Sequence, residues 1–138
     1  MKYIITTIFL LVPLWSKESK IKILVMKPIP SSLLAQIAFN ECEGCSNEEL
    51  LVVLATIKNR VGHKDFPSTL DSVLLQPNQF STIKQEVSIK FIKKIDSLWK
   101  LPKEYHYLYF RSAGYSKKPW MNRHNWIKHK NFYHEFAQ

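Results

Sequence analysis

Apolar side chains recur at helical spacing directly after residue 30. Three apolar residues and one carboxylate share a single helical face, at positions i, i+3, i+4 and i+7: Leu34, Ile37, Ala38 and Glu41. A serine at position 31 or 32 can cap this helix, and Gly44 is a typical residue to end it. The pattern therefore predicts a helix in which Glu41 continues the apolar face.

A second helical pattern follows within a few residues. Residues 46–47 offer a cap, and Glu48 and Glu49 fall in the first turn, where the helix dipole favours acidic side chains. Four apolar residues form its buried stripe: Leu50, Leu54, Ile57 and Val61. On this phasing Glu43, Glu48 and Glu49 are exposed and dispensable. Glu41 is then the one carboxylate of this region without an ordinary structural explanation.

The second half of the chain changes from helical to strand-like patterns. A short helix capped by Ser68 or Thr69 is expected to run through Leu75, and a longer helix over residues 87–98. The aromatic stretch 105–112 and the segment 131–136 have the character of strands, and residues 117–126 that of a loop. The sequence therefore predicts an α+β domain, with several helices followed by a small antiparallel sheet.

The length and composition suit one folded domain with a modest core. The chain has 138 residues, of which 46% are hydrophobic and 13% aromatic. Residues 1–16 hold one lysine and an apolar run of 13 residues, too short for a transmembrane helix and typical of a signal peptide. An uncleaved N-terminal membrane anchor is the alternative. We therefore expect residues 1–16 to direct export, 17–30 to be a spacer, and 31–138 to work in the cell envelope, the periplasm or outside the cell.

The positive charge is concentrated in one part of the chain. Residues 84–130 contain twelve Lys and Arg against three Asp and Glu, and this excess equals the formal net charge of +9. A basic surface favours polyanions such as nucleic acid, anionic lipid or the anionic polymers of a cell wall. Export makes nucleic acid the least favoured of these partners. A basic surface that serves only solubility is an equally simple interpretation.

The two cysteines are three positions apart. Cys42 and Cys45 form a C-x-x-C pair, which is found in redox motifs and as half of a metal site. Zinc would need two more ligands, and the histidines begin only at His63. A local disulfide in an exported domain and two ordinary structural residues both fit this spacing. The sequence therefore predicts no metal or cofactor.

Several short motifs stand in a characteristic order. They are "FNECEG" at 39–44, "NRV" at 59–61, "FPSTLDSV" at 66–73, "QPNQFS" at 76–81 and "FY" at 132–133. Together they resemble the spore cortex-lytic (SleB/CwlJ-type) cell-wall hydrolases, and the resemblance extends from Leu33 to Tyr133. It implies a small lysozyme-like domain, a truncated form of the lytic transglycosylase fold. It also implies a monomer that takes no cofactor and acts on the glycan strand of peptidoglycan, between N-acetylmuramic acid and N-acetylglucosamine.

The resemblance assigns Glu41 as the catalytic residue. A glycosidase needs a carboxylic acid that stays protonated near neutral pH, and a buried position raises the pKa of a Glu. A hydrolase usually has a second carboxylate. Asp65 and Asp71 are candidates, but Cys45 stands where the family commonly has an acid. One carboxylate can serve twice if the sugar's own 6-hydroxyl attacks, so we expect lytic transglycosylation. A Glu41 that is merely buried and hydrogen-bonded is the alternative.

Further residues are candidates for substrate binding. The polar candidates for contacts with sugar hydroxyls or N-acetyl groups are Asn59, Gln76, Gln79 and Ser81, although such residues also make structural corners. The aromatic candidates for stacking on sugar rings are Tyr107, Tyr109, Tyr115, Trp120 and Trp126, although core packing is the commoner role of such residues. We expect Arg60 to pair with a helix-end carbonyl or with Asp71, without a catalytic role.

Three other functions are compatible with the same sequence. An exported non-catalytic module that binds the wall, or an immunity-like module, would use the aromatic residues and basic surface without a catalytic Glu. A muramidase would use Glu41 with a second carboxylate. An amidase that cuts the peptide stem would need zinc or a Cys/His pair, for which Cys45 and His129 are the candidates. The products released from purified peptidoglycan distinguish the three enzymes.

Overall fold

The computed structural model describes residues 31–81, 86–102, 104–115 and 119–138. The expected signal segment and spacer lie outside these ranges. The described elements are helices α1 (Ser31–Cys42), α2 (Asn47–Arg60), α3 (Leu70–Leu74) and α4 (Ile89–Trp99), the 3-10 helix η1 (Pro119–Arg123), and strands β1 (Tyr109–Ser112), β2 (Ile127–Lys128) and β3 (His134–Ala137). None of the described helices combines the length and apolar character needed to cross a membrane.

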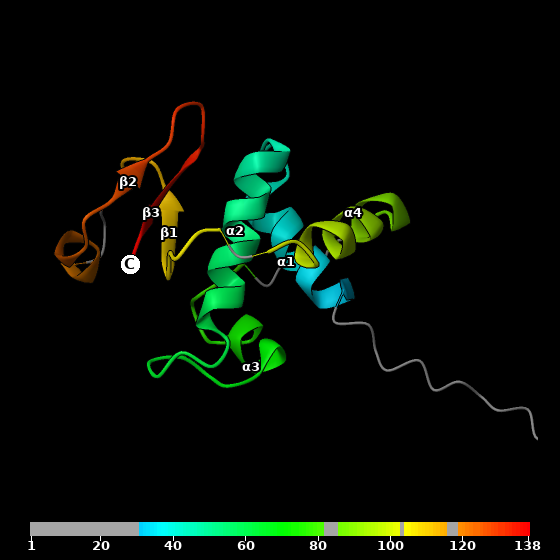
Figure 1. Ribbon diagram of the computed structural model, residues 1–138, viewed down its shortest axis with the longest axis horizontal. Coiled ribbons are helices and arrows are strands. Elements are labelled where there is room, and N and C mark those ends of the chain that lie inside the picture. Colours follow the sequence, from blue (N-terminus) through cyan, green and yellow to red (C-terminus); the bar gives the residue numbers. More distant parts are fainter. Residues whose placement is uncertain (1–30, 82–85, 103, 116–118) are drawn as a thin grey trace, which may run out of the picture.

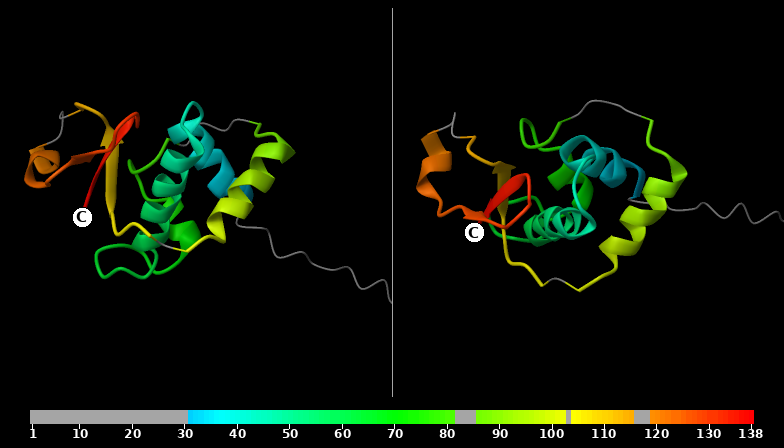
Figure 2. Two further views of the ribbon diagram at one scale, coloured as in Figure 1. Left: turned by 45° about the horizontal axis from the view of Figure 1, so that its top comes forward. Right: turned by 90° about the horizontal axis from the view of Figure 1, so that it is seen from above.

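Helix α2 lies at the centre of the arrangement. The small sheet stands on one side of α2, and α1 and α4 pack together on the other (Figures 1 and 2). Helix α3 packs near the C-terminal end of α2, and strand β1 also packs on α2. The helices therefore precede the sheet along the chain and lie beside it in space, which confirms the predicted α+β class.

The sheet has three antiparallel strands in the order β1-β3-β2. Phe110 of β1 pairs with Phe136 of β3, and the next pair along is Arg111 with Glu135. The side chains of this second pair form an ion pair of 2.9 Å. Because successive residues of a strand face opposite sides, Phe136 is fully buried while the Arg111–Glu135 pair lies on the other face.

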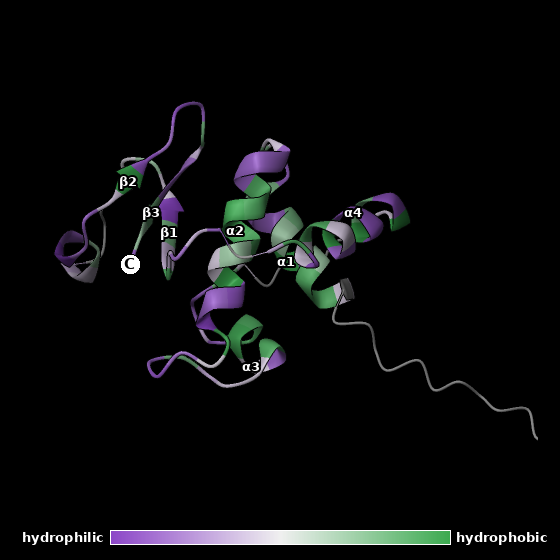
Figure 3. Cartoon of the chain, viewed as in Figure 1, coloured by the Kyte–Doolittle hydropathy of each residue, from purple (hydrophilic) through white to green (hydrophobic). Residues whose placement is uncertain are grey.

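The core surrounds α2 on almost every side. Along this helix the residues with low exposure run consecutively from Val52 to Ile57, and Figure 3 shows the apolar colouring continuing through the middle of α2 and along α1. Leu34, Ile37 and Ala38 of α1 meet it, as the helical spacing predicted. A helix that is enclosed in this way has little exposed face, so its phase alone does not tell which of its polar residues are exposed.

The helix boundaries follow the predicted caps closely. Ser46 accepts a hydrogen bond from the backbone of Glu49, and Thr69 accepts one from Ser72. Helix α4 is capped by Ser88, so it begins two residues later than predicted. The strand regions are shorter than predicted: only 109–112 of the first stretch pairs as a strand, the predicted loop includes η1, and β2 was not predicted.

The prediction for Glu49 is wrong. This side chain is 0% exposed, whereas Glu43 and Glu48 are exposed as expected. Its Oε1 accepts hydrogen bonds from the backbone N–H of His134 at 2.8 Å and from the ring Nδ1 of the same residue at 2.8 Å. The first turn of α2 is covered by β3, a contact between residues 85 positions apart. A favourable position for the helix dipole therefore did not mean exposure to solvent.

Candidate active site

Glu41 lies in the last turn of α1 and reaches across to the chain after the "QPNQF" turn. Its Oε1 accepts a hydrogen bond of 2.7 Å from the backbone N–H of Ser81. The residue is half-buried, so it is less enclosed than its place on the apolar face had suggested. A carboxylate that is fixed by a backbone donor and still reached by solvent can meet a polymer substrate.

Asn40, the residue before Glu41, binds the other backbone group of Ser81. Nδ2 of Asn40 donates a hydrogen bond of 3.2 Å to the carbonyl oxygen of Ser81. Asn40 and Glu41 together therefore bind the carbonyl oxygen and the N–H of Ser81, which lies 40 positions after Glu41. This pair of contacts fixes the carboxylate of Glu41 against the segment that carries the "QPNQFS" motif.

Arg60, at the end of α2, is a buried cation close to this site. Its exposure is 4%, its Nε donates 2.7 Å to the carbonyl of Leu108, and one terminal nitrogen lies 3.5 Å from Oε1 of Gln79. Burial lowers the pKa of Arg60 to about 10, while electrostatic interactions with Tyr109 and Glu41 favour its charged form. The expected partner Asp71 is exposed, and the observed acceptor is a carbonyl next to β1 rather than one at a helix end.

Aromatic rings surround the guanidinium of Arg60. Its carbon Cζ lies 5.0–5.9 Å from the ring centres of Phe66, Phe80, Tyr109 and Phe110. These rings come from the "FPST" turn, the "QPNQFS" motif and strand β1, and Arg60 itself is the middle residue of "NRV". Three of the five motifs therefore meet around one buried side chain. Cation–π contact offsets part of the cost of burying this charge.

The polar residues predicted to bind substrate make different contacts in the structure. Nδ2 of Asn59 donates to the carbonyls of Tyr105 at 2.7 Å and Tyr107 at 3.0 Å. Asn59 also lines a surface hollow of about 360 Å³ with His63, His106, Leu108 and Gln138. Oε1 of Gln76 is buried without a hydrogen-bond partner among the described residues. Of the four predicted residues, Ser81 is the one that contacts Glu41 directly; sugar binding by any of them stays a prediction.

The aromatic candidates divide into two groups. Tyr107 packs on Phe136, with ring centres 5.4 Å apart, and its hydroxyl lies 3.0 Å from Nε2 of His129. The ring of Tyr109 packs in tilted orientation against His124 and Trp120, with ring centres 4.3 Å and 5.9 Å apart, and the contact with Trp120 connects β1 to η1. Tyr115 and Trp120 are exposed, whereas Trp126 is half-buried and covers the guanidinium of Arg111. Tyr115 and Trp120 are therefore the more exposed of the aromatic candidates.

The cysteine pair is a disulfide, and it follows Glu41 immediately. Cys42 is the last residue of α1, and it is joined to Cys45 in the turn before α2. The histidine beside Cys45 is His134, whose Nδ1 lies 4.0 Å from its sulfur, whereas His129 contacts Tyr107. The nucleophilic Cys45–His129 pair that an amidase would need does not form.

The second carboxylates considered from the sequence are exposed and lie in ordinary positions. Asp65 forms an ion pair of 3.8 Å with His63 in the turn after α2. Asp71 occupies the first turn of α3. Within the described part of the chain, neither forms a hydrogen bond or ion pair with Glu41 or Arg60. The arrangement around Glu41 is therefore one reachable carboxylate, one backbone donor and one buried cation.

Enzymes that cleave glycosidic bonds commonly use a carboxyl group as a general acid, and Glu41 is a half-buried carboxylate at the end of a helix. The chain matches the family model described as cell wall hydrolase over residues 44–136. This range covers more than half of the chain, so the chain belongs to the cell wall hydrolase family. The match begins three residues after Glu41.

Two solved structures have a similar fold. One is the catalytic domain of the germination-specific lytic transglycosylase SleB from Bacillus anthracis, with a TM-score of 0.66 and 23% identity over 79% of this chain and 93% of that one. The other is the catalytic domain of the SleB protein of Bacillus cereus, with a TM-score of 0.65 and 23% identity over 79% and 89% of the two chains. No curated protein matches. The predicted resemblance to this family is thus confirmed.

Proposed function

We propose that this chain cleaves the glycan strand of peptidoglycan between N-acetylmuramic acid and N-acetylglucosamine, as a lytic transglycosylase, with Glu41 as the catalytic residue. One observation carries the proposal: the Glu41 carboxylate is half-buried, accepts the Ser81 N–H at 2.7 Å and stays within reach of solvent. Membership of the cell wall hydrolase family supports the substrate. The lytic transglycosylase activity of the similar SleB domain from Bacillus anthracis supports the reaction.

The reaction needs one group that first gives and then takes a proton. Protonated Glu41 donates to the oxygen that bridges the two sugars, and the bond between that oxygen and C1 of the muramic acid breaks. The 6-hydroxyl of the same muramic acid then attacks C1, and its proton returns to Glu41. The bridging oxygen leaves as a hydroxyl, and a 1,6-anhydro ring is formed. No water is consumed, and Glu41 ends in its starting state.

The positions of the other carboxylates favour this route over hydrolysis. A hydrolase would need a second carboxylate beside the scissile bond. Glu49 is 0% exposed, so a sugar polymer cannot reach it. Asp65 and Asp71 are exposed in a turn and in the first turn of a helix, which are ordinary places for acidic residues.

The surface of α4 provides a site for an anionic polymer. Lys90, Lys93 and Lys94 fall at i, i+3 and i+4 and, with Phe91, line an open hollow of about 550 Å³. Phe91 packs edge-on against Phe39 with ring centres 5.4 Å apart, and Phe39 lies two residues before Glu41. A basic surface connected to the active-site helix suits the anionic polymers of a wall better than it suits solubility alone.

The location proposed for the enzyme follows from its substrate. We place residues 31–138 as the catalytic domain, residues 17–30 as a spacer and residues 1–16 as the export signal or anchor. The described domain begins with α1, whose last turn carries Glu41, so the catalytic unit needs all of α1. Peptidoglycan lies outside the cytoplasmic membrane, so the domain must be exported to meet it.

The test is a mass spectrum of the products released from purified peptidoglycan. Lytic transglycosylation gives 1,6-anhydromuramic ends, which are lighter by one water than the reducing ends made by a hydrolase. Glu41→Gln, which keeps the size of the side chain, should release nothing and should keep the melting temperature of the native chain. Reducing ends as the main product would show a muramidase, and free peptides an amidase. An active Glu41→Gln variant would overturn the assignment of Glu41.

A further inference from the structure

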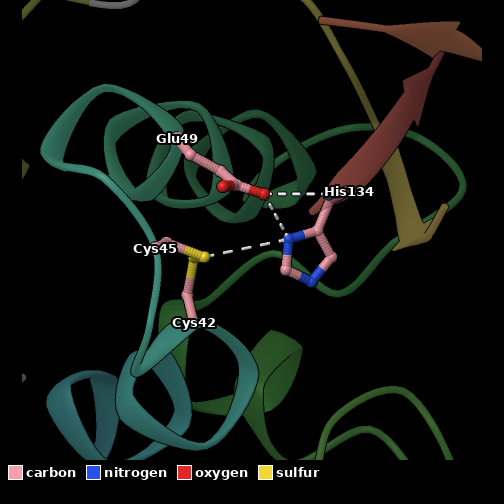
Figure 4. A group of neighbouring side chains, drawn as sticks. All are labelled: Cys42, Cys45, Glu49 and His134. Atoms are coloured by element: carbon pink, nitrogen blue, oxygen red, sulfur yellow. Dashed lines mark hydrogen bonds and ion pairs between the residues drawn. A yellow bond between two sulfur atoms is a disulfide. The ribbon is translucent and has the colours of Figure 1, made fainter. Parts of the chain in front are cut away.

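Four side chains with metal-ligating atoms meet where α1, α2 and β3 come together. They are Cys42, Cys45, Glu49 and His134, and one ligand atom from each lies within 4.8 Å of the other three. Figure 4 shows the two sulfurs, the carboxylate and the imidazole converging on one point, from the end of α1, the turn after it, the first turn of α2 and the start of β3. Cys42, Glu49 and His134 are buried, and Cys45 is half-buried.

One oxygen of this cluster has no hydrogen-bond partner. Oε1 of Glu49 accepts two hydrogen bonds from His134, but Oε2 is buried without a partner among the described residues. The whole side chain is 0% exposed. A buried carboxylate oxygen without a partner is costly, because nothing replaces the water it has lost. This oxygen is therefore a place where a cation would be stabilised.

The cysteines decide when a cation can bind. In the disulfide the two sulfurs are bonded to each other and are not thiolates, so only Glu49 and His134 can ligate. Reduction turns the pair into two thiols, and the full set becomes two sulfurs, one nitrogen and one oxygen. Four such ligands suit tetrahedral zinc, for which bond lengths of about 2.0–2.3 Å place neighbouring ligand atoms about 3.3–3.8 Å apart. The observed maximum of 4.8 Å exceeds that range by about 1 Å.

We propose that Cys42, Cys45, Glu49 and His134 form a zinc site that exists only when the Cys42–Cys45 disulfide is reduced. The region where α1, α2 and β3 meet can then be cross-linked in two ways. Under oxidising conditions the disulfide joins α1 to the following turn. Under reducing conditions a metal ion joins these two segments and also binds α2 and β3. This site is separate from Glu41 and takes no part in the proposed cleavage reaction.

The conversion balances with a dithiol as the reductant. The dithiol supplies two electrons and two protons to the S–S bond, giving two cysteine thiols, and is itself oxidised to a disulfide. Zinc binding then releases the two thiol protons. In the disulfide form Nδ1 of His134 faces Oε1 of Glu49 at 2.8 Å, so that nitrogen carries the ring proton. The zinc form uses the other tautomer, in which Nε2 carries the proton and Nδ1 binds the metal.

The first experiment compares the oxidised and reduced full-length chain with Co²⁺ as a spectroscopic probe for zinc. The protein is reduced with a dithiol, freed of it without air, and titrated. The reduced chain should bind one Co²⁺ with thiolate-to-cobalt charge-transfer absorption, and Zn²⁺ should displace it. The oxidised chain should bind neither ion. Circular dichroism of both forms shows whether the fold persists. If the reduced chain does not bind Co²⁺, or if the oxidised chain binds it equally, the proposal is overturned.

The second experiment tests the two ligands that are not sulfur. Glu49→Gln and His134→Gln should each weaken Zn²⁺ binding by the reduced chain more than about tenfold. Glu48→Gln and His106→Gln are matched controls, because both native residues are exposed, and these variants should bind as the native chain does. Unchanged zinc affinity in both test variants would mean that the thiols bind alone, which would overturn the four-ligand site. Glu41→Gln should keep full zinc binding, so this proposal and the proposed function can fail independently.

Discussion

The Glu49 carboxylate accepts both the backbone N–H and the ring Nδ1 of His134, at 2.8 Å each, and so fastens the first turn of α2 to the start of β3. Glu49→Gln keeps the shape of the side chain but weakens both bonds and places an amide N–H in this buried cluster. We expect the free energy of unfolding to fall by about 2–4 kcal/mol, the range for disrupting a buried, hydrogen-bonded ionisable pair. Denaturant unfolding of the oxidised protein measures it.

Two neighbouring variants provide the control for that measurement. Glu48→Gln and Glu43→Gln change exposed residues, so each should alter the free energy of unfolding by no more than about 0.5–1 kcal/mol and leave wall-degrading activity unchanged. A Glu49→Gln variant as stable as these two would contradict the structural role of the Glu49–His134 contact.

Asn40 is expected to position Glu41, the proposed catalytic residue. Asn40→Ala removes the hydrogen bond to the carbonyl of Ser81, so the Ser81 N–H is held less firmly against Glu41. The rate of turbidity loss of a wall suspension should fall about ten- to hundredfold, as expected when a reacting group is slightly misplaced. Gln36→Ala, one turn earlier on α1, is the matched control and should keep the native rate. Equal rates in both variants would count against this role of Asn40.

Arg60 is expected to be irreplaceable by lysine. A lysine keeps the charge but loses the Nε donor to Leu108, the contact with Gln79 and the flat guanidinium that stacks among the aromatic rings. Arg60→Lys should lower the free energy of unfolding by about 2–3 kcal/mol. Arg123→Lys at an exposed position should have almost no effect, and the two variants are compared by denaturant unfolding. A stable Arg60→Lys variant would show that the charge alone suffices.

The helices were predictable because their signals are local. Ser46 and Thr69 cap the helices that their positions predicted, and the spacing of Leu34, Ile37 and Ala38 gave the buried face of α1. The short strands were less predictable, because β2 has two residues and exists only through its pairing with β3. A strand of that length has no periodicity of its own.

The residues whose surroundings could not be predicted from the sequence all have partners that are distant along the chain. Glu49 looked exposed because nothing near it in the chain indicates that His134 covers it, 85 positions later. For the same reason the sequence does not indicate that His134 lies beside Cys42 and Cys45. Arg60 gave one usable signal, its place in "NRV", but its aromatic surroundings come from three other segments. Glu41 could be singled out from the sequence because its motif and its helix are both local, and its catalytic role stays a prediction.

The lysines of α4 are expected to bind the wall electrostatically. Changing Lys90, Lys93 and Lys94 to Gln together should weaken co-sedimentation with purified wall at about 0.1 M salt, where the Debye length is about 10 Å. At about 1 M salt, where that length is about 3 Å, the native chain and the variant should sediment alike. A control that neutralises the exposed Lys64, Arg123 and Lys130 loses the same charge elsewhere. Equal weakening by both triple variants would mean that net charge, rather than this surface, governs binding.

The enclosure of α2 also governs how the molecule can open. Helices α1, α3 and α4 and strand β1 all pack on α2, so the amide protons from Val52 to Ile57 reach water only when those contacts are lost together. Such protons exchange with solvent through opening of the whole domain, whereas those of α4 and η1 can exchange through local fluctuations. The exchange rate at the middle of α2 therefore reports the global stability of the domain.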